Sequence, residues 1–125
     1  MQTQKIIYRI STGLLVLGML ATFGNYFFNP AFKIIFPHLG FPNWFRIELG
    51  TAKLLGAIAI AIPAIPSRVK EWAYFGFFIS FSSALLAHYN AGDPAFNLVP
   101  PFLMLFILVT SYLTYHKVTA EKQAI

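Results

Sequence analysis

Residues 44–62, WFRIELGTAKLLGAIAIAI, decide the fold, because they are long and apolar enough to cross a membrane and yet carry three charges. At about 1.5 Å per residue, a helix of this length spans the roughly 30 Å apolar core of a bilayer. The charged residues are Arg46, Glu48 and Lys53. A charge near the centre of a span costs roughly 2.5–3.5 kcal/mol on insertion scales, so these side chains need polar surroundings. They are the first candidates for a functional site.

The composition indicates one membrane-embedded domain, residues 1–125. The chain is 58% hydrophobic and 10% charged, whereas a soluble domain is roughly 25% charged. It has no cysteine, which excludes disulfides, thiolate metal sites and cysteine nucleophiles. The net charge is +5, but the basic residues flank apolar stretches and form no stripe. Membrane topology therefore explains them better than nucleic-acid binding, and we expect no nucleic-acid partner.

The apolar pattern predicts an all-α fold, a polytopic membrane four-helix bundle with spans at about 6–28, 44–62, 69–89 and 98–115. The segment between the first two spans, NPAFKIIFPHLGFPN, is too short to cross a membrane and too apolar for a free loop. It therefore reads as an interfacial or re-entrant segment. Turns are expected around residues 63–67 and 90–94, where proline, glycine and asparagine gather. The polar tail from residue 117 onward is expected to fray.

The distribution of basic residues predicts the orientation. One side of the predicted bundle carries six of them: Lys5, Arg9, Arg68, Lys70, Lys117 and Lys122. The opposite side carries Lys33, and Arg46 if its side chain reaches outward. Because basic residues favour the cytoplasmic side, both termini are expected in the cytoplasm and the chain in a bacterial-type inner membrane. This bias also argues against a dual-topology transporter.

Polar residues from three separate segments are predicted to meet at the outer end of the helices. Arg46 and Glu48 lie in the first turn of the second span, His88 ends the third, and Asp93 lies in the following turn. Lys53 lies deeper, on the same helical stripe as Arg46. We therefore predict a ligand-binding site, without a metal and without an assigned catalytic residue. Its residues are Arg46, Glu48, Lys53, His88 and Asp93.

Each of these residues also has a structural explanation. A structural explanation fits Arg46 and Glu48 as well as a functional one: they form an interfacial ion pair, or they anchor the helix at its depth in the membrane. His88 ends a helix, and an aspartate before Pro94 is a usual turn residue. Lys53 is explained by either a structural or a functional buried charge. Glu48 lies about 140° around the helix from it, so the two cannot pair within one helix.

The third span offers acceptors for the deep lysine. Ser80 and Ser83 lie on a face of small residues at about the depth of Lys53, and their hydroxyls can accept from an ammonium, although helix packing alone also explains that face. Thr110 and Ser111 of the fourth span are slightly deeper alternatives. Two further histidines, His38 and His116, are interpreted as interfacial, and they carry no signal of a functional site.

Several short motifs along the chain point to a known family. They are Gly40-Phe41-Pro42, Trp44-Phe45-Arg46, Leu49-Gly50, Lys53-Leu54-Leu55-Gly56, Lys70-Glu71-Trp72-Ala73-Tyr74, Gly76-Phe77-Phe78, Ser83-Ala84, Ala87-His88 and Gly92-Asp93. Over about residues 20–117 the chain resembles the DoxX-like membrane protein family. The resemblance implies a four-helix membrane architecture. The founding DoxX protein is a small subunit of a thiosulfate–quinone oxidoreductase, so the resemblance also implies an association with redox chemistry and a quinone as the candidate cofactor.

Three functions remain open at this point. The first is a small accessory or assembly subunit of a membrane complex, in which His88 or Lys53 donates to a quinone oxygen and Glu48 or Asp93 orients the histidine. The second is a small proton-coupled transporter or exporter that uses Glu48. The third is a structural or chaperone-like module, acting with a partner or as a homo-oligomer. An enzyme acting alone is least expected, because the sequence offers no nucleophile–base set, metal cluster or paired haem histidines.

Overall fold

The computed structural model describes the backbone of residues 2–124 and the side chains of residues 2–120. Over this range the chain is helical and has no strand, as predicted. The helices in chain order are α1 (Gln2–Phe28), α2 (Phe32–His38), α3 (Asn43–Ala61), α4 (Ser67–Asn90), the 3-10 helix η1 (Ala95–Leu98) and α5 (Val99–Ala124).

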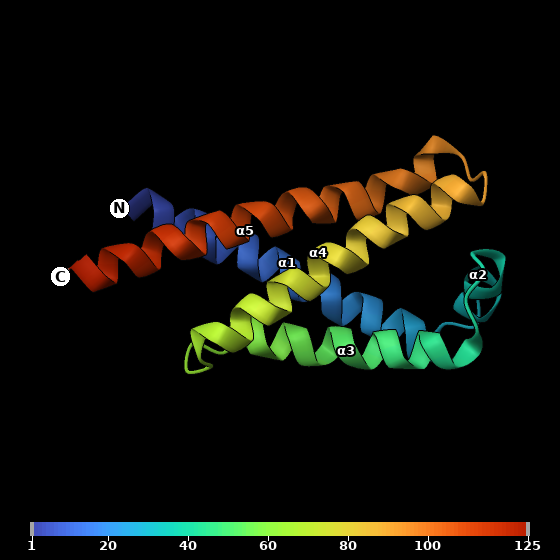
Figure 1. Cartoon of the computed structure of the whole chain (residues 1–125), viewed down its shortest axis with the longest axis horizontal. Helices are drawn as coiled ribbons and strands as arrows, with labels where there is room; N and C mark the ends of the chain where they lie inside the picture. The colour runs from blue at the N-terminus through green and yellow to red at the C-terminus, as the bar shows by residue number, and fades with distance from the viewer. Residues whose placement is uncertain (1, 125) are drawn as a thin grey trace.

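The four long helices pack as neighbours in a ring. Helix α1 contacts α3 and α5, and α4 contacts the same two helices from the other side. Both termini and the α3–α4 turn lie at one end of the molecule, and α2 and the α4–α5 connection lie at the other (Figure 1). We call these the terminal end and the α2 end. Each long helix contributes to one apolar core, which includes Leu15, Ala57, Phe77, Phe81 and Leu108.

Proline and glycine set the ends of the helices. Pro42 and Pro66 directly precede α3 and α4 in extended or polyproline-like conformations. Proline has no backbone N–H to donate to a preceding helical turn, so it is tolerated at the start of a helix. Gly40 and Gly92 have φ angles of 92° and 75°, a left-handed conformation that glycine adopts without steric cost. They end α2 and α4 respectively.

The observed elements agree with the predicted spans near residues 28, 44, 62, 69 and 89, but α1 begins at residue 2 instead of 6 and α5 continues beyond residue 115. The segment between α1 and α3 contains the short helix α2, with Phe36 only 4% exposed. Helix α5 continues through residues 117–124, so the prediction of a frayed tail was wrong over that stretch. The reason is packing, since Tyr115 and Val118 are buried and the ring of Tyr115 lies 5.9 Å from that of Tyr8 in α1. Residue 125 lies outside the described range.

Within residues 2–120, two helical segments have the length and hydropathy of a membrane span, namely α1 and the segment Ala95–Ala120, which consists of η1 and most of α5. Helix α3 carries Arg46, Glu48 and Lys53, and α4 carries charges in its first turn and serine, histidine and asparagine residues towards its end. These polar residues lower the hydropathy of the two helices. By composition, therefore, residues 2–120 contain two candidate membrane spans. Composition alone does not identify α3 and α4 as membrane spans.

Candidate functional site

A carboxylate held between two histidines joins three segments at the α2 end. Asp93 Oδ2 lies 2.6 Å from His88 Nδ1, and Asp93 Oδ1 lies 2.7 Å from His38 Nε2. An ionised carboxylate only accepts hydrogen bonds, so each imidazole donates one N–H to a different oxygen of Asp93. The Asp93 side chain is 11% exposed and that of His38 is 52% exposed, so the cluster lies at the rim of the molecule. It ties α2 to the end of α4.

Two similar helix ends bring this cluster together. At the end of α4, Asp93 N–H donates to His88 O and Gly92 N–H to Tyr89 O. At the end of α2, Phe41 N–H donates to Phe36 O and Gly40 N–H to Pro37 O. Both patterns are Schellman motifs, in which a left-handed glycine satisfies the last carbonyls of a helix. His88 and Asp93 are thereby fixed on one motif, and His38 on the other.

The histidines lower the pKa of Asp93 below its ordinary value of 3.8, chiefly through the hydrogen bond from His88 and next through that from His38. A carboxyl whose pKa is lowered by folding stabilises the fold above its ordinary pKa, and this contribution is lost as the pH falls through the lowered value. We therefore expect Asp93→Asn to reduce the loss of thermal stability that the protein shows below pH 3.8. The measurement is a series of thermal unfolding curves from pH 6 to pH 2.5.

Glu48→Gln is the matched control for this experiment, because Glu48 is an exposed carboxylate with no hydrogen bond or ion pair to any side chain in residues 2–120. The control variant should keep the acid sensitivity of the unchanged protein. An Asp93→Asn variant with an unaltered acid profile would contradict the stabilising role of the cluster.

Arg46, in the first turn of α3, is buried, at 5% exposure, and its side chain contacts the C-terminal end of α1. Its Nη1 donates to the carbonyl of Tyr26, and its Nε and Nη2 lie 3.2 and 3.0 Å from Asn43 Oδ1. Tyr26 is in the last turn of α1, where carbonyls lack a partner within the helix and the helix dipole is negative. Arg46 therefore caps α1 and fixes the start of α3 against it.

Lys53 is also buried, at 6% exposure, on the same stripe of α3 as Arg46 and about two turns further along the helix. Its Nζ lies 3.3 Å from the hydroxyl of Tyr26 and 5.1 and 5.4 Å from the centres of the Tyr26 and Phe81 rings. No carboxylate of residues 2–120 forms an ion pair with it. Lys53 therefore lies in an aromatic environment with one neutral acceptor, the Tyr26 hydroxyl. Because an ammonium has three N–H donors, Lys53 can donate to a further acceptor.

A cavity between α3 and α4 reaches Lys53. It has a volume of about 340 Å³ and is lined mainly by apolar residues, with Trp72 and Phe77 from α4 and Gly56 from α3. Its polar side chains are Lys53 and Ser80. We call this the α3–α4 groove. The two polar residues come from the two helices that form the groove, Lys53 from α3 and Ser80 from α4.

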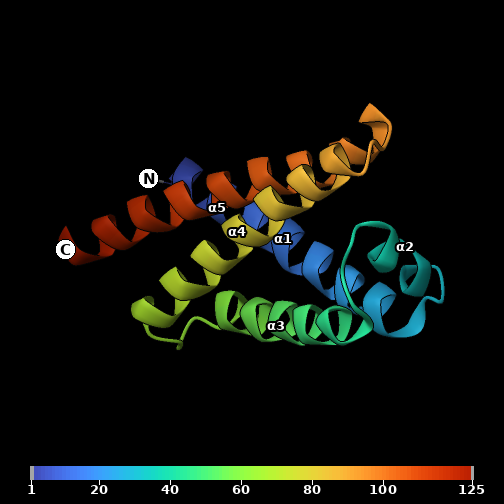
Figure 2. The same ribbon diagram turned by 45° about the vertical axis from the view of Figure 1, so that its right-hand side comes forward.

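The structure thus divides the five predicted site residues into three environments. His88 and Asp93 meet directly, Arg46 and Lys53 both bond to Tyr26, and Glu48 is exposed and bonds to none of the other four. Ser80 lines the same groove as Lys53 without bonding to it. Helix α2 joins the first two environments, since His38 bonds to Asp93 and the Phe36 ring meets the Tyr26 ring edge-on at 4.9 Å. Figure 2 shows α2 beside the end of α1 and the start of α3.

Sequence reasoning missed several polar contacts. His38 bonds to Asp93, and His116 Nε2 lies 2.6 Å from Glu71 Oε1, so both interfacial histidines have acidic partners that the sequence did not signal. Ser111 does not bond to Lys53. Its hydroxyl lies 2.6 Å from that of Thr12 and 2.7 Å from that of Tyr74, in a buried chain that links α1, α5 and α4. Polar residues inside otherwise apolar spans were the signal for this chain of hydroxyls.

Comparison with known proteins agrees with these observations. Residues 10–111 match the DoxX-like family, over a range that includes α2, the histidine–aspartate cluster, the α3–α4 groove and the first half of α5. No curated protein and no solved structure matches the chain. The match covers most of the sequence and confirms the resemblance carried by the motifs around Arg46, Lys53 and His88. The chain belongs to the DoxX-like family.

Proposed function

We propose that all four long helices cross the membrane. Each exposes large apolar side chains along its outer surface, for example Leu17 at 65%, Leu55 at 62%, Phe75 at 65% and Phe106 at 68%. Water would not favour so much exposed apolar surface, whereas lipid does. Helix α3 has 19 residues, about 28 Å at 1.5 Å per residue, which is long enough to span. Its charged residues Arg46 and Lys53 are buried against other helices.

The orientation proposed is the one that the basic residues favour, with both termini and the α3–α4 turn in the cytoplasm. The chain lacks cysteine, so single cysteines can report the topology directly. A cysteine at Ala95 should react in intact cells with a maleimide that cannot cross the membrane. A cysteine at Ala64, which is also exposed, should react only after the cells are opened. The reverse pattern would contradict this orientation.

We further propose that the protein is a small accessory subunit that holds a quinone in the α3–α4 groove. The observation that supports this most strongly is Lys53, a buried ammonium with a single neutral partner, beside a groove of about 340 Å³. A quinone carbonyl is an acceptor without charge, its ring is flat, and its tail is apolar. These properties match one strong donor, aromatic walls and a groove lined mainly by apolar residues. Redox chemistry would belong to the partner complex.

Trp72 provides the readout for this proposal, because it lines the groove and quinones quench indole fluorescence. The chain has two tryptophans, so Trp44→Phe leaves Trp72 as the only indole. Decylubiquinone, added to this variant in a nonionic detergent, should quench Trp72 saturably. Decylbenzene, which has a ring and tail but no carbonyl, should not compete. Quenching that rises linearly without saturation would indicate partition into the micelle and would overturn the proposal.

A structural module is the second candidate, and the bonding of Arg46 supports it, because that cation serves only to join α1 to α3. Such a module would not depend on Lys53 for binding. The exporter hypothesis depends on Glu48, which is exposed and near the start of α3 rather than buried in the helix packing. The Lys53 variants described in the Discussion separate the accessory subunit from the structural module.

A further inference from the structure

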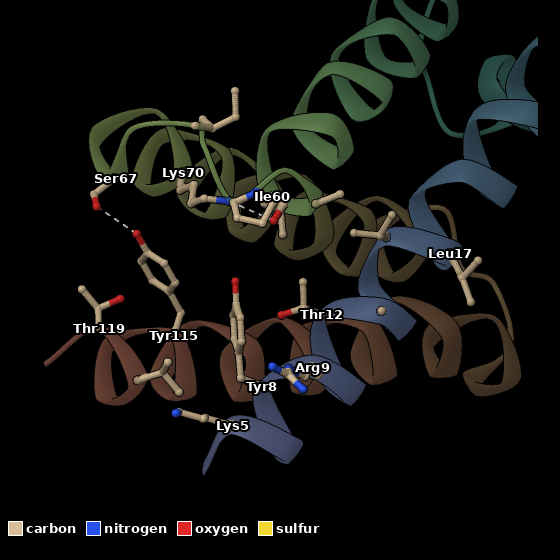
Figure 3. A pocket seen from close by; sticks show the side chains of 16 residues that line it. Lys5, Tyr8, Arg9, Thr12, Leu17, Ile60, Ser67, Lys70, Tyr115 and Thr119 are labelled. Atoms are coloured by element: carbon tan, nitrogen blue, oxygen red, sulfur yellow. Dashed lines mark hydrogen bonds between the residues drawn. The ribbon is translucent and has the colours of Figure 1, made fainter. Parts of the chain in front are cut away.

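A second and larger cavity, of about 780 Å³, opens at the terminal end of the molecule, away from the α3–α4 groove. Helices α1, α3 and α5 and the start of α4 surround it (Figure 3). Neither the proposed quinone site nor the histidine–aspartate cluster uses any of its residues. Its walls combine basic, hydroxyl and apolar side chains, and the question is which ligand such a combination fits.

Among residues 2–120, the charged side chains that line this cavity are all basic. They are Lys5 and Arg9 from α1 and Lys70 from α4, and no aspartate or glutamate of that range lines it. Lys70 Nζ donates to the carbonyls of Ala59 and Ile60, which leaves one of its three donors for a ligand. Lys5 and Arg9 are exposed and form no ion pair with any side chain of residues 2–120. The cavity therefore favours an anion.

The cavity changes character along the axis of α1. One face of α1 lines the cavity with four residues at spacings of four, three and four: Lys5, Arg9, Thr12 and Val16. Basic side chains thus lie nearest the terminus, a hydroxyl follows, and an apolar wall that includes Leu17 continues towards the middle of the helix (Figure 3). About seven residues, or roughly 10 Å, separate Arg9 from Val16. This order matches an amphiphile with an anionic head group at the membrane surface.

We propose that this cavity binds the phosphodiester head group of an anionic phospholipid from the leaflet that faces the terminal end. The basic residues receive the phosphate, and the first part of an acyl chain follows Val16 and Leu17. Basic pockets between membrane helices on the cytoplasmic side are suited to such lipids. This inference rests on the membrane placement proposed above, but it is independent of the quinone proposal, because the two sites share no residue.

The test uses the purified, delipidated protein in an uncharged detergent and native mass spectrometry to count bound lipid. Dioleoyl phosphatidylglycerol should bind at least about tenfold more tightly than dioleoyl phosphatidylcholine. The double variant Lys5→Gln/Arg9→Gln should abolish this preference, since each basic residue near an anionic lipid multiplies affinity roughly fivefold. The double variant Arg68→Gln/Lys117→Gln removes the same charge from exposed residues outside the cavity and should keep the preference.

A second pair of variants tests the cavity itself at unchanged charge. A Cβ at Gly13, which lines the cavity, and one at Gly24 both meet no atom within 4 Å. Gly13→Leu should therefore fill the cavity and weaken phosphatidylglycerol binding several-fold, whereas Gly24→Leu on the same helix should not. Three results would overturn the proposal: equal binding of the two lipids, equal losses in the two charge variants, or displacement of the lipid by glycerol 3-phosphate, which would indicate a site for soluble phosphates.

Discussion

Lys53→Met is expected to weaken the binding of decylubiquinone by about 10- to 100-fold, as measured by saturable quenching of Trp72. A hydrogen bond to a charged group contributes roughly 1.5–3 kcal/mol, and each 1.4 kcal/mol is a factor of ten in affinity. Methionine has nearly the volume of lysine and no donor, so the shape of the α3–α4 groove should persist. Gly76→Ala is the matched control, because Gly76 lines the same groove and a Cβ there meets no atom within 4 Å.

The same substitution should leave the protein equally or more stable. Taking a charge out of water costs several kcal/mol, and this is regained only when the charge is well paired. Lys53 has one neutral partner, the Tyr26 hydroxyl at 3.3 Å, so methionine removes an unpaired charge and leaves no carboxylate without a partner. A loss of binding with retained stability would identify Lys53 as a ligand-binding residue. A loss of stability with unchanged quinone binding would instead favour the structural module.

The sequence predicted the helices well because apolar spacing and proline positions act locally. Helix α3 begins after Pro42 and ends one residue before the predicted boundary at 62, and Pro66 directly precedes α4. The end of α5 depends on a long-range contact instead, the packing of Tyr115 against Tyr8. No local pattern reports such a contact, so the length of this helix was underestimated.

The candidate site could be predicted only in part, for the same reason. The pairing of His88 with Asp93 follows from one helix end, since the two residues are five positions apart on a motif ended by Gly92. The position of His38 depends on how α2 folds back over the molecule, and no hydrophobic period sets that position. The sequence therefore placed two members of the cluster and not the third.

The partners of the two buried cations show how close packing decides contacts that spacing leaves open. Arg46 and Lys53 were predicted on one helical stripe, and both are buried, as is Gly50 between them. The helix that receives this stripe is α1, and a Cβ at Gly50 would lie 2.7 Å from Phe27 Cε2, so glycine leaves room for the Phe27 ring at this contact. Tyr26 is thereby brought to both cations, whereas the serines of α4 had been expected to serve Lys53.

Lys70→Met should have the opposite effect on stability from Lys53→Met, although both lysines are buried. Lys70 is 4% exposed, and its Nζ lies 2.9 Å from both Ala59 O and Ile60 O. These carbonyls belong to the last turn of α3, where backbone acceptors lack helical partners and a cation offsets the helix dipole. Methionine would leave them buried without a donor, so we expect the free energy of unfolding to fall by about 2–4 kcal/mol.

Unfolding in mixed detergent micelles measures this difference, with Arg68→Met as the control. Arg68 is an exposed cation two residues earlier in α4, so its loss should change stability by less than about 0.5 kcal/mol. Lys70→Arg should recover part of the loss, since a guanidinium also donates to carbonyls. If Lys70→Met and Lys53→Met changed stability alike, burial alone would govern both lysines. Opposite changes would mean that Lys70 stabilises the fold through the carbonyls to which it donates. They would also mean that the buried charge of Lys53 lowers the free energy of unfolding, as expected for a residue that is retained to bind a ligand.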